Sequence, residues 1–121
     1  MADALAGQHA VTIEDFARLD IRVGRVLEAA VLERARKPAY RLRIDLGPGL
    51  GERNSSAQIT EAYSVDALAG RLVLCVVNLP PRRVAGFKSE VLTLGVYSDA
   101  GPVVLIAPDP HGPARPGDRL G

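Results

Sequence analysis

The chain has 121 residues, enough for one hydrophobic core but not for two. Its 12 Gly and 9 Pro indicate many turns and short strands, which excludes a bundle of long helices. The 15 basic and 14 acidic residues almost cancel, so net charge identifies no anionic partner and only local charge placement is informative. Thirteen of the basic residues are Arg, whose forked guanidinium suits phosphate contacts, although a compositional bias explains that number equally well.

The first residues are expected to be a flexible N-terminal tail, residues 1–11, in front of a single domain, residues 12–121. The tail carries Asp3 and no positive charge, so it lacks the organisation of a secretory signal. No apolar run approaches the length that spans a membrane. We therefore expect a cytoplasmic protein with no membrane insertion.

A short helix is predicted over residues 13–18. Thr12 caps it, and Asp15 completes the acidic variant of the capping box. Ile13 and Phe16 share one face of this helix. Because so short a helix does not form without packing, we expect that face to be buried against this chain or a second copy.

Alternating apolar and charged residues predict a long, curved first strand over residues 20–32, with Gly24 at a bulge or bend. Residues 40–46 alternate strictly, so an apolar face opposes a basic face that carries Arg41 and Arg43. Tyr40 belongs to the apolar face, with its hydroxyl at the rim of the core.

The Gly- and Pro-rich residues 47–51 predict a turn that leads into a third strand over residues 53–59. Two helical turns follow, with Ser64 as a cap and Gly70 as a stop. Further strands are expected at residues 71–78, 91–97 and 103–107, with Cys75 buried in the first of these. These segments make about five strands, and five short strands with a helical insert between the third and fourth match the order of an all-β OB-fold barrel.

Basic residues form two groups, and in an OB-fold both groups can line the oligonucleotide groove. A solvated charged surface is the alternative interpretation. The polar loop at residues 54–58 favours RNA, because amide and hydroxyl groups beside Arg can contact bases and ribose. Phe87 has a polar setting and can stack on an unpaired base, although packing inside the barrel is favoured. The residues predicted to contact phosphates are Arg36, Lys37, Arg41, Arg43, Arg82, Arg83 and Lys88, and those predicted to donate or accept directional hydrogen bonds are Ser55, Ser56, Gln58, Asn78 and Ser89.

The sequence contains none of the common motifs that indicate catalysis. His9 lies in the tail and His111 in a Pro- and Gly-rich turn, and no metalloprotease motif, paired Cys, phosphate loop or serine elbow occurs. We predict no catalytic residues, no metal site and no cofactor.

Several linked motifs resemble the CsaA proteins, a branch of the stand-alone tRNA-binding domain family related to modules of some methionyl- and phenylalanyl-tRNA synthetases. The resemblance covers nearly the whole chain from about Thr12. It is carried by Leu19-Asp20-Ile21-Arg22-Val23-Gly24, Arg36-Lys37-Pro38-Ala39-Tyr40, Ser55-Ser56-Ala57-Gln58-Ile59-Thr60, Val77-Asn78, Pro80-Pro81-Arg82, Ser89-Glu90-Val91-Leu92 and Pro108-Asp109.

The resemblance implies an OB-fold core whose terminal extensions form a homodimer that binds tRNA through its shape and backbone. CsaA proteins are also described as export-related chaperones that hold unfolded preproteins on apolar surface at the dimer, which is the alternative function. One departure is Ala85-Gly86, where the wider family often has Arg-Gly. That change removes one candidate for phosphate binding, for which Arg82, Arg83 and Lys88 are expected to compensate.

Overall fold

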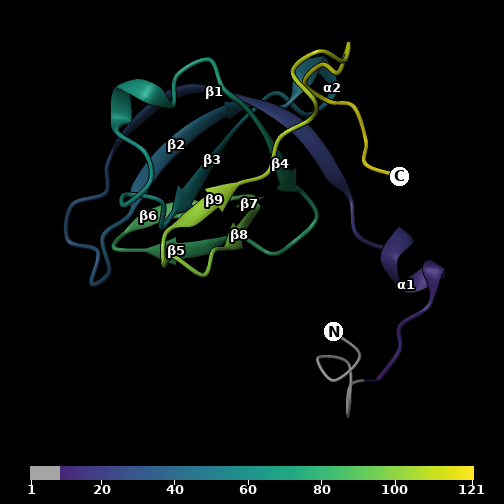
Figure 1. The fold of residues 1–121 in the computed structure, drawn as a ribbon, viewed down its shortest axis with the longest axis horizontal. Helices are drawn as coiled ribbons and strands as arrows, with labels where there is room; N and C mark the ends of the chain where they lie inside the picture. Colours follow the sequence, from purple (N-terminus) through teal and green to yellow (C-terminus); the bar gives the residue numbers. More distant parts are fainter. Residues whose placement is uncertain (1–8) are drawn as a thin grey trace.

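A computed structural model describes residues 9–121, and most of the tail predicted for residues 1–11 lies outside that range (Figure 1). Five strands form one antiparallel sheet in the order β3-β2-β1-β4-β7, and two further hairpins pair β5 with β6 and β8 with β9. The elements are α1 (Ile13–Ala17), β1 (Ile21–Val31), β2 (Tyr40–Asp45), α2 (Gly47–Leu50), β3 (Glu52–Ala57), the 3-10 helix η2 (Val65–Ala67), β4 (Leu72–Val76), β5 (Arg82–Val84), β6 (Phe87–Ser89), β7 (Leu92–Thr93), β8 (Gly95–Tyr97) and β9 (Val103–Leu105).

The five-stranded sheet curls into a nearly closed barrel. Its edge strand β3 approaches the segment before β7, where the backbone nitrogens of Glu90 and Val91 donate to the carbonyl oxygen of Asn54 at 2.8 and 3.3 Å. Closure of this kind removes exposed sheet edges. The predicted all-β, OB-like barrel is confirmed.

The core lies inside the barrel, and strict alternation along β2 supplies much of it. Leu42 and Ile44 are buried while the residues between them point outward. The hydroxyl of Tyr40 donates to the carbonyl oxygen of Tyr63 at 2.8 Å, as expected for a core residue with its polar end at the rim. Cys75 is fully buried, and desolvation raises the pKa of its thiol to about 11.

Gly24 has a different role from the predicted bulge. The irregularity in the pairing of β1 with β2 falls between Val26 and Glu28. A Cβ at Gly24 would lie 2.5 Å from Cγ2 of Ile44, so a side chain there would collide with the core. This glycine is required for close approach of the two strands rather than for a bend.

Two local predictions about the connections need correction. Ser64 stands at the N-cap of η2, but its side chain makes no capping hydrogen bond, while Gly70 has the positive φ expected of a helix stop. No strand was predicted between residues 78 and 91, where the structure has the β5–β6 hairpin. Its two turn residues, Ala85 and Gly86, have φ of 50° and 83°, which is typical of a tight turn with both central residues left-handed.

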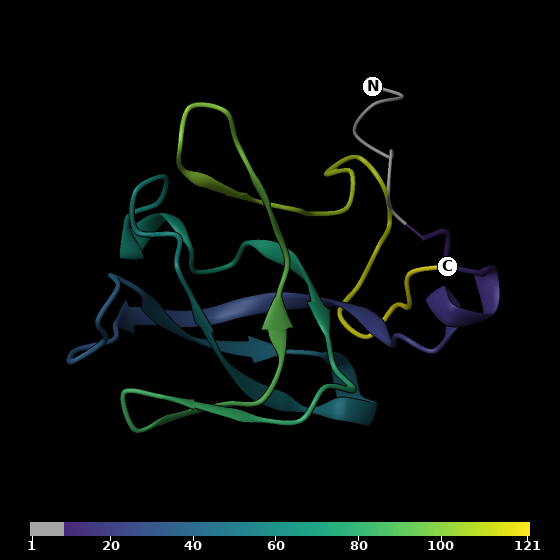
Figure 2. The ribbon, with the colours of Figure 1, turned by 90° about the horizontal axis from the view of Figure 1, so that it is seen from below.

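The two terminal segments lie at the same end of the barrel (Figures 1 and 2). Residues 117–120 run along the start of β1. There the backbone nitrogen of Val23 donates to the carbonyl oxygen of Asp118, and the backbone nitrogen of Leu120 donates to the carbonyl oxygen of Ile21. The helix α1 stands apart from the barrel in both views and has no buried residue. Its predicted capping box between Thr12 and Asp15 is present.

Candidate nucleic-acid interface

The outward-pointing residues of β1, β2 and β3 form one polar surface, which we call the outer face. Antiparallel register places Ala30 opposite Arg41 and Glu28 opposite Arg43 on one side. On the other side of β2, the partners of the two arginines are Ser56 and Asn54. Because alternate residues of paired strands share a face, these six side chains project to the same side of the sheet.

The two arginines of the outer face differ in what holds them. Nε of Arg43 lies 2.6 Å from a carboxylate oxygen of Glu52, and its Nη1 donates to the side-chain oxygen of Asn54 at 3.3 Å. Arg41 has no ion pair or side-chain hydrogen bond with any residue from 9 to 121. A phosphate would therefore compete with Glu52 for Arg43 but would meet Arg41 free.

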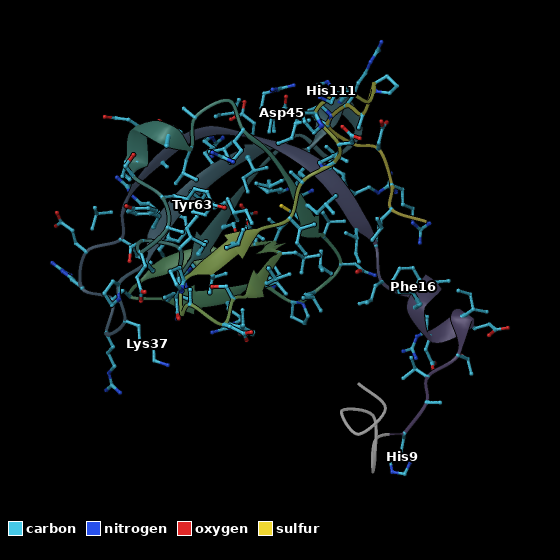
Figure 3. The ribbon with its side chains drawn as sticks, viewed as in Figure 1. His9, Phe16, Lys37, Asp45, Tyr63 and His111 are labelled. Carbon is cyan, nitrogen blue, oxygen red and sulfur yellow. The ribbon has the colours of Figure 1, made fainter. Side chains whose placement is uncertain are left out.

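Two basic segments border the outer face. Arg36 and Lys37 are exposed in the β1–β2 loop, and Lys37 projects from the end of the molecule opposite Phe16 (Figure 3). Arg83 and Lys88 are exposed on the β5–β6 hairpin, which packs beside β3. Arg82, on the same hairpin, is exposed but lines the second depression described below. The predicted cations thus come from three elements around one surface.

Phe87 is partly buried and does not belong to the barrel core, contrary to the favoured prediction. It lines one wall of a cavity of about 300 Å³ on the outer face, which we call the Phe87 cleft. The cleft is lined by Glu28, Ala29, Ala30, Arg41, Leu42, Arg43, Asn54 and Phe87. Glu28 was not predicted from sequence, and Asn54 was predicted only as part of the polar loop at residues 54–58; strand register places both beside Arg43.

Two predicted hydrogen-bonding residues near the outer face, Ser55 and Ser89, serve the fold instead. Ser55 is fully buried, and its hydroxyl contacts the carbonyl oxygen of Val91 at 3.0 Å and Oγ1 of Thr93 at 2.8 Å, so it is not available to RNA. The hydroxyl of Ser89 accepts a hydrogen bond from the backbone nitrogen of Ser56 at 3.0 Å and joins β6 to β3. Gln58 is exposed beyond the end of β3.

Asn78 lies far from the outer face, at the base of α1. Its side-chain oxygen accepts from the backbone nitrogen of Asp20 at 2.9 Å, and its amide nitrogen donates to the carbonyl oxygen of Arg18 at 2.8 Å. Arg119 donates to the carbonyl oxygen of Ala17 at 3.0 Å. A hydrogen bond from Arg22 holds the pKa of Asp20 below its usual value. These bonds fix the direction of a helix that has no core contacts of its own.

Replacing the buried serine tests this assignment. Ser55→Ala is expected to lower the free energy of unfolding by about 1–3 kcal/mol, because the oxygens of Val91 and Thr93 lose a buried partner. Urea denaturation measures the loss. Ser56→Ala, the neighbour on the outer face, is the matched control and should change stability by less than about 0.5 kcal/mol. A Ser55→Ala variant with the free energy of unfolding of the unmodified protein would contradict the structural role.

A second depression, which we call the apolar groove, lies between the end of β3, the β5–β6 hairpin and strands β7 to β9. Its volume is about 490 Å³, and its lining includes Leu79, Val84, Leu92, Leu94, Tyr97 and Val103. Leu79, Leu92 and Tyr97 are all exposed, Tyr97 at 92%. The groove therefore presents more apolar surface than the Phe87 cleft does.

The described part of the chain also bears on metal binding and on membrane insertion. From residue 9 onward, no three His, Cys, Asp or Glu side chains gather as metal ligands. Within the same range, no helix has the length and apolar character needed to cross a membrane.

The barrel and its bordered outer face define an OB-like domain of the kind that binds nucleic acids. Residues 21–119 match the family described as "Putative tRNA binding domain". The solved CsaA chaperones of Picrophilus torridus and Bacillus anthracis are 44% and 47% identical to this chain, with TM-scores of 0.86 and 0.85. Each comparison covers 93% of this chain and 100% of the other. The chain belongs to this tRNA-binding domain family and, within it, to the CsaA proteins.

Longer proteins also contain a similar domain. The methionine–tRNA ligase of Archaeoglobus fulgidus is 36% identical over 110 residues, which are 91% of this chain and 16% of the ligase. The corresponding ligase of Porphyromonas gingivalis is 40% identical over 98 residues, 14% of its length. The chain thus spans about one-sixth of these curated relatives.

Proposed function

We propose that this protein is a non-catalytic, cytoplasmic tRNA-binding protein that works as a homodimer and recognises tRNA by backbone and shape. The observation that carries the proposal is the guanidinium of Arg41, which has no side-chain partner among residues 9–121, on an outer face bordered by two exposed basic segments. Phosphate contacts from several elements of one surface position a nucleic acid without reading its sequence.

The distribution of cations supports a folded RNA as the ligand. Arg36 and Lys37 extend from one end of β2, whereas Arg83 and Lys88 lie on a hairpin beyond β3. Contacts spread in this way match a rigid, curved backbone better than a single phosphate group. The acidic residues Glu28 and Glu52 on the same surface oppose indiscriminate binding of polyanions.

Homodimer formation is the second part of the proposal, and α1 supports it. Ile13 and Phe16 are 74% and 39% exposed on a helix of five residues. So short a helix requires packing, and no other described element supplies it. A second copy of the chain, with its own exposed α1, provides an apolar surface of the same kind by two-fold symmetry.

The direct test compares binding of bulk tRNA and an equal mass of duplex DNA by electrophoretic mobility shift across a salt series. We expect saturable tRNA binding that persists at salt concentrations where DNA binding is lost, because shape-dependent contacts add to the salt-sensitive phosphate contacts. Equal affinity for the two polymers at every salt concentration would reject tRNA recognition.

The apolar groove favours a second candidate function, the holding of unfolded preproteins for export. Exposed apolar patches mark surfaces for other proteins, and the two solved CsaA relatives are named chaperones. Purified protein would then suppress aggregation of chemically denatured clients. Leu79→Ser with Leu92→Ser should abolish the suppression of aggregation and leave tRNA binding intact. Val31→Ser, which changes an exposed residue outside the groove, should preserve both activities. Failure of the unmodified protein with several clients would reject this function.

A further inference from the structure

The Phe87 cleft has the size and form of a site for one nucleobase. Its volume of about 300 Å³ lies at the lower limit for pockets that hold small molecules. A ring from the hairpin forms one wall, and β1 and β2 form the other. A duplex does not fit such a cleft, but a single flat base that has left its stack does.

The cleft holds an unused donor and an unused acceptor. Arg41 and Glu28 both line it, and neither makes an ion pair or a side-chain hydrogen bond with any residue in the described range 9–121. They lie on the same face of adjacent strands in diagonal positions, because Glu28 is opposite Arg43 and Ala30 is opposite Arg41. Arg43 and Asn54 are already bonded to each other and complete the floor.

We infer that the cleft binds one unstacked guanine from an unpaired segment of the RNA. Phe87 stacks on the base, and Glu28 accepts from the N1 and N2 hydrogens. Arg41 donates to O6 and N7 with two of its five N–H groups and keeps the others for a phosphate. Guanine presents two acceptors on one edge and two donors on the next, which matches a cation beside a carboxylate. Adenine replaces one of those acceptors with a donor, and the pyrimidines lack N7.

The inference rests on the proposed tRNA-binding function and adds what the protein reads besides the backbone. Arginines alone would bind any phosphate, and Phe87 alone would stack on any base. Glu28 adds to the discrimination by Arg41, because a carboxylate repels phosphate and accepts two hydrogen bonds side by side from the N1 and N2 hydrogens of guanine. It is a specificity-determining residue rather than an affinity residue.

The experiment uses fluorescein-labelled RNA pentamers UUNUU, in which N is G, A, C or U, with binding followed by anisotropy. We expect the G pentamer to bind about tenfold more tightly than the U pentamer, the equivalent of one good bidentate contact. Glu28→Gln should reduce that ratio severalfold, and the preference for G over U that remains is the contribution of Arg41 through O6 and N7. Glu33→Gln, which removes an exposed carboxylate in the β1–β2 loop, is the matched control and should keep the ratio.

Stacking is tested separately. Phe87→Leu keeps the apolar wall but removes the aromatic face, so it should weaken binding of all four pentamers by about five- to 100-fold. Phe16→Leu is the matched control on α1 and should leave pentamer binding unchanged. Circular dichroism of each variant verifies that the barrel is folded.

The outcomes separate this inference from the function on which it rests. Equal affinities for the four pentamers, in a protein that binds tRNA, would overturn the guanine site and leave tRNA recognition standing. A guanine preference that Glu28→Gln weakens, in a protein with no affinity for tRNA, would support the site and reject tRNA as the ligand. Absence of binding to both tRNA and pentamers would overturn both.

Discussion

Arg41→Ala combined with Arg43→Ala is expected to weaken tRNA binding about 100-fold at low salt. A hydrogen bond to a charged group contributes about 1.5–3 kcal/mol, and each lost contact therefore multiplies the dissociation constant by a factor of about ten or more. The slope of the logarithm of affinity against the logarithm of salt concentration should become shallower by about two, one for each phosphate contact. Mobility-shift titrations from about 0.05 to 0.2 M salt measure both quantities.

The single variants should differ, and that difference follows from Glu52. Arg43 is held at 2.6 Å by Glu52, so a phosphate gains from it only by displacing a carboxylate. Arg41 has no such competitor among residues 9–121, and Arg41→Ala should account for most of the loss. Glu52→Gln should strengthen binding by releasing Arg43.

The control for these variants is Arg115→Ala, an exposed arginine in the C-terminal segment. It removes the same charge away from the outer face and should leave both the affinity and the salt slope nearly unchanged. A folded double variant with the affinity and slope of the unmodified protein would remove the outer face from the binding site. Similar losses for Arg41→Ala and Arg115→Ala would mean that the ligand responds only to net charge.

The outer face was predictable from sequence because β2 alternates without interruption. Every second residue from Tyr40 to Asp45 is apolar, and a period of two leaves no choice about which side Arg41 and Arg43 occupy. The core followed from the same pattern. The capping box of α1 was also readable, since both of its partners lie within three residues.

The side-chain roles in β3 and after β4 were not readable locally, because their partners are distant in sequence. Ser55 bonds to Val91 and Thr93, 36 and 38 positions away, and Asn78 bonds to Asp20, 58 positions away. The register between β2 and β3 offers one clue to the burial of Ser55, because Ser55 pairs with the buried Leu42.

The β5–β6 hairpin was missed because its strands are three residues long and its turn carries neither Asn nor Asp. Ala85 adopts a left-handed φ that favours other residue types, so the usual turn signal is absent. With the hairpin unassigned, Phe87 could not be placed over the outer face, and the cleft that it lines was not predicted.

The second large effect is expected on α1, where Ile13→Ser with Phe16→Ser should convert a dimer to a monomer. Burial of one such side chain contributes about 1.5 kcal/mol or more, and a two-fold interface contains four of them, which gives about 6 kcal/mol. The dimer dissociation constant should therefore rise about 10,000-fold. Sedimentation equilibrium over a range of protein concentrations measures it.

Two features of the structure make this a clean test of the interface. Neither side chain is buried in the barrel, so the double variant should keep the unfolding free energy of an isolated protomer. The bonds from Asn78 and Arg119 hold α1 at its C-terminal end and are untouched by the change. Val31→Ser, an equally exposed aliphatic change at the far end of β1, should leave the dimer intact. Unchanged association of the α1 variant would assign the interface to another surface, and a monomeric unmodified protein at every concentration would reject the homodimer.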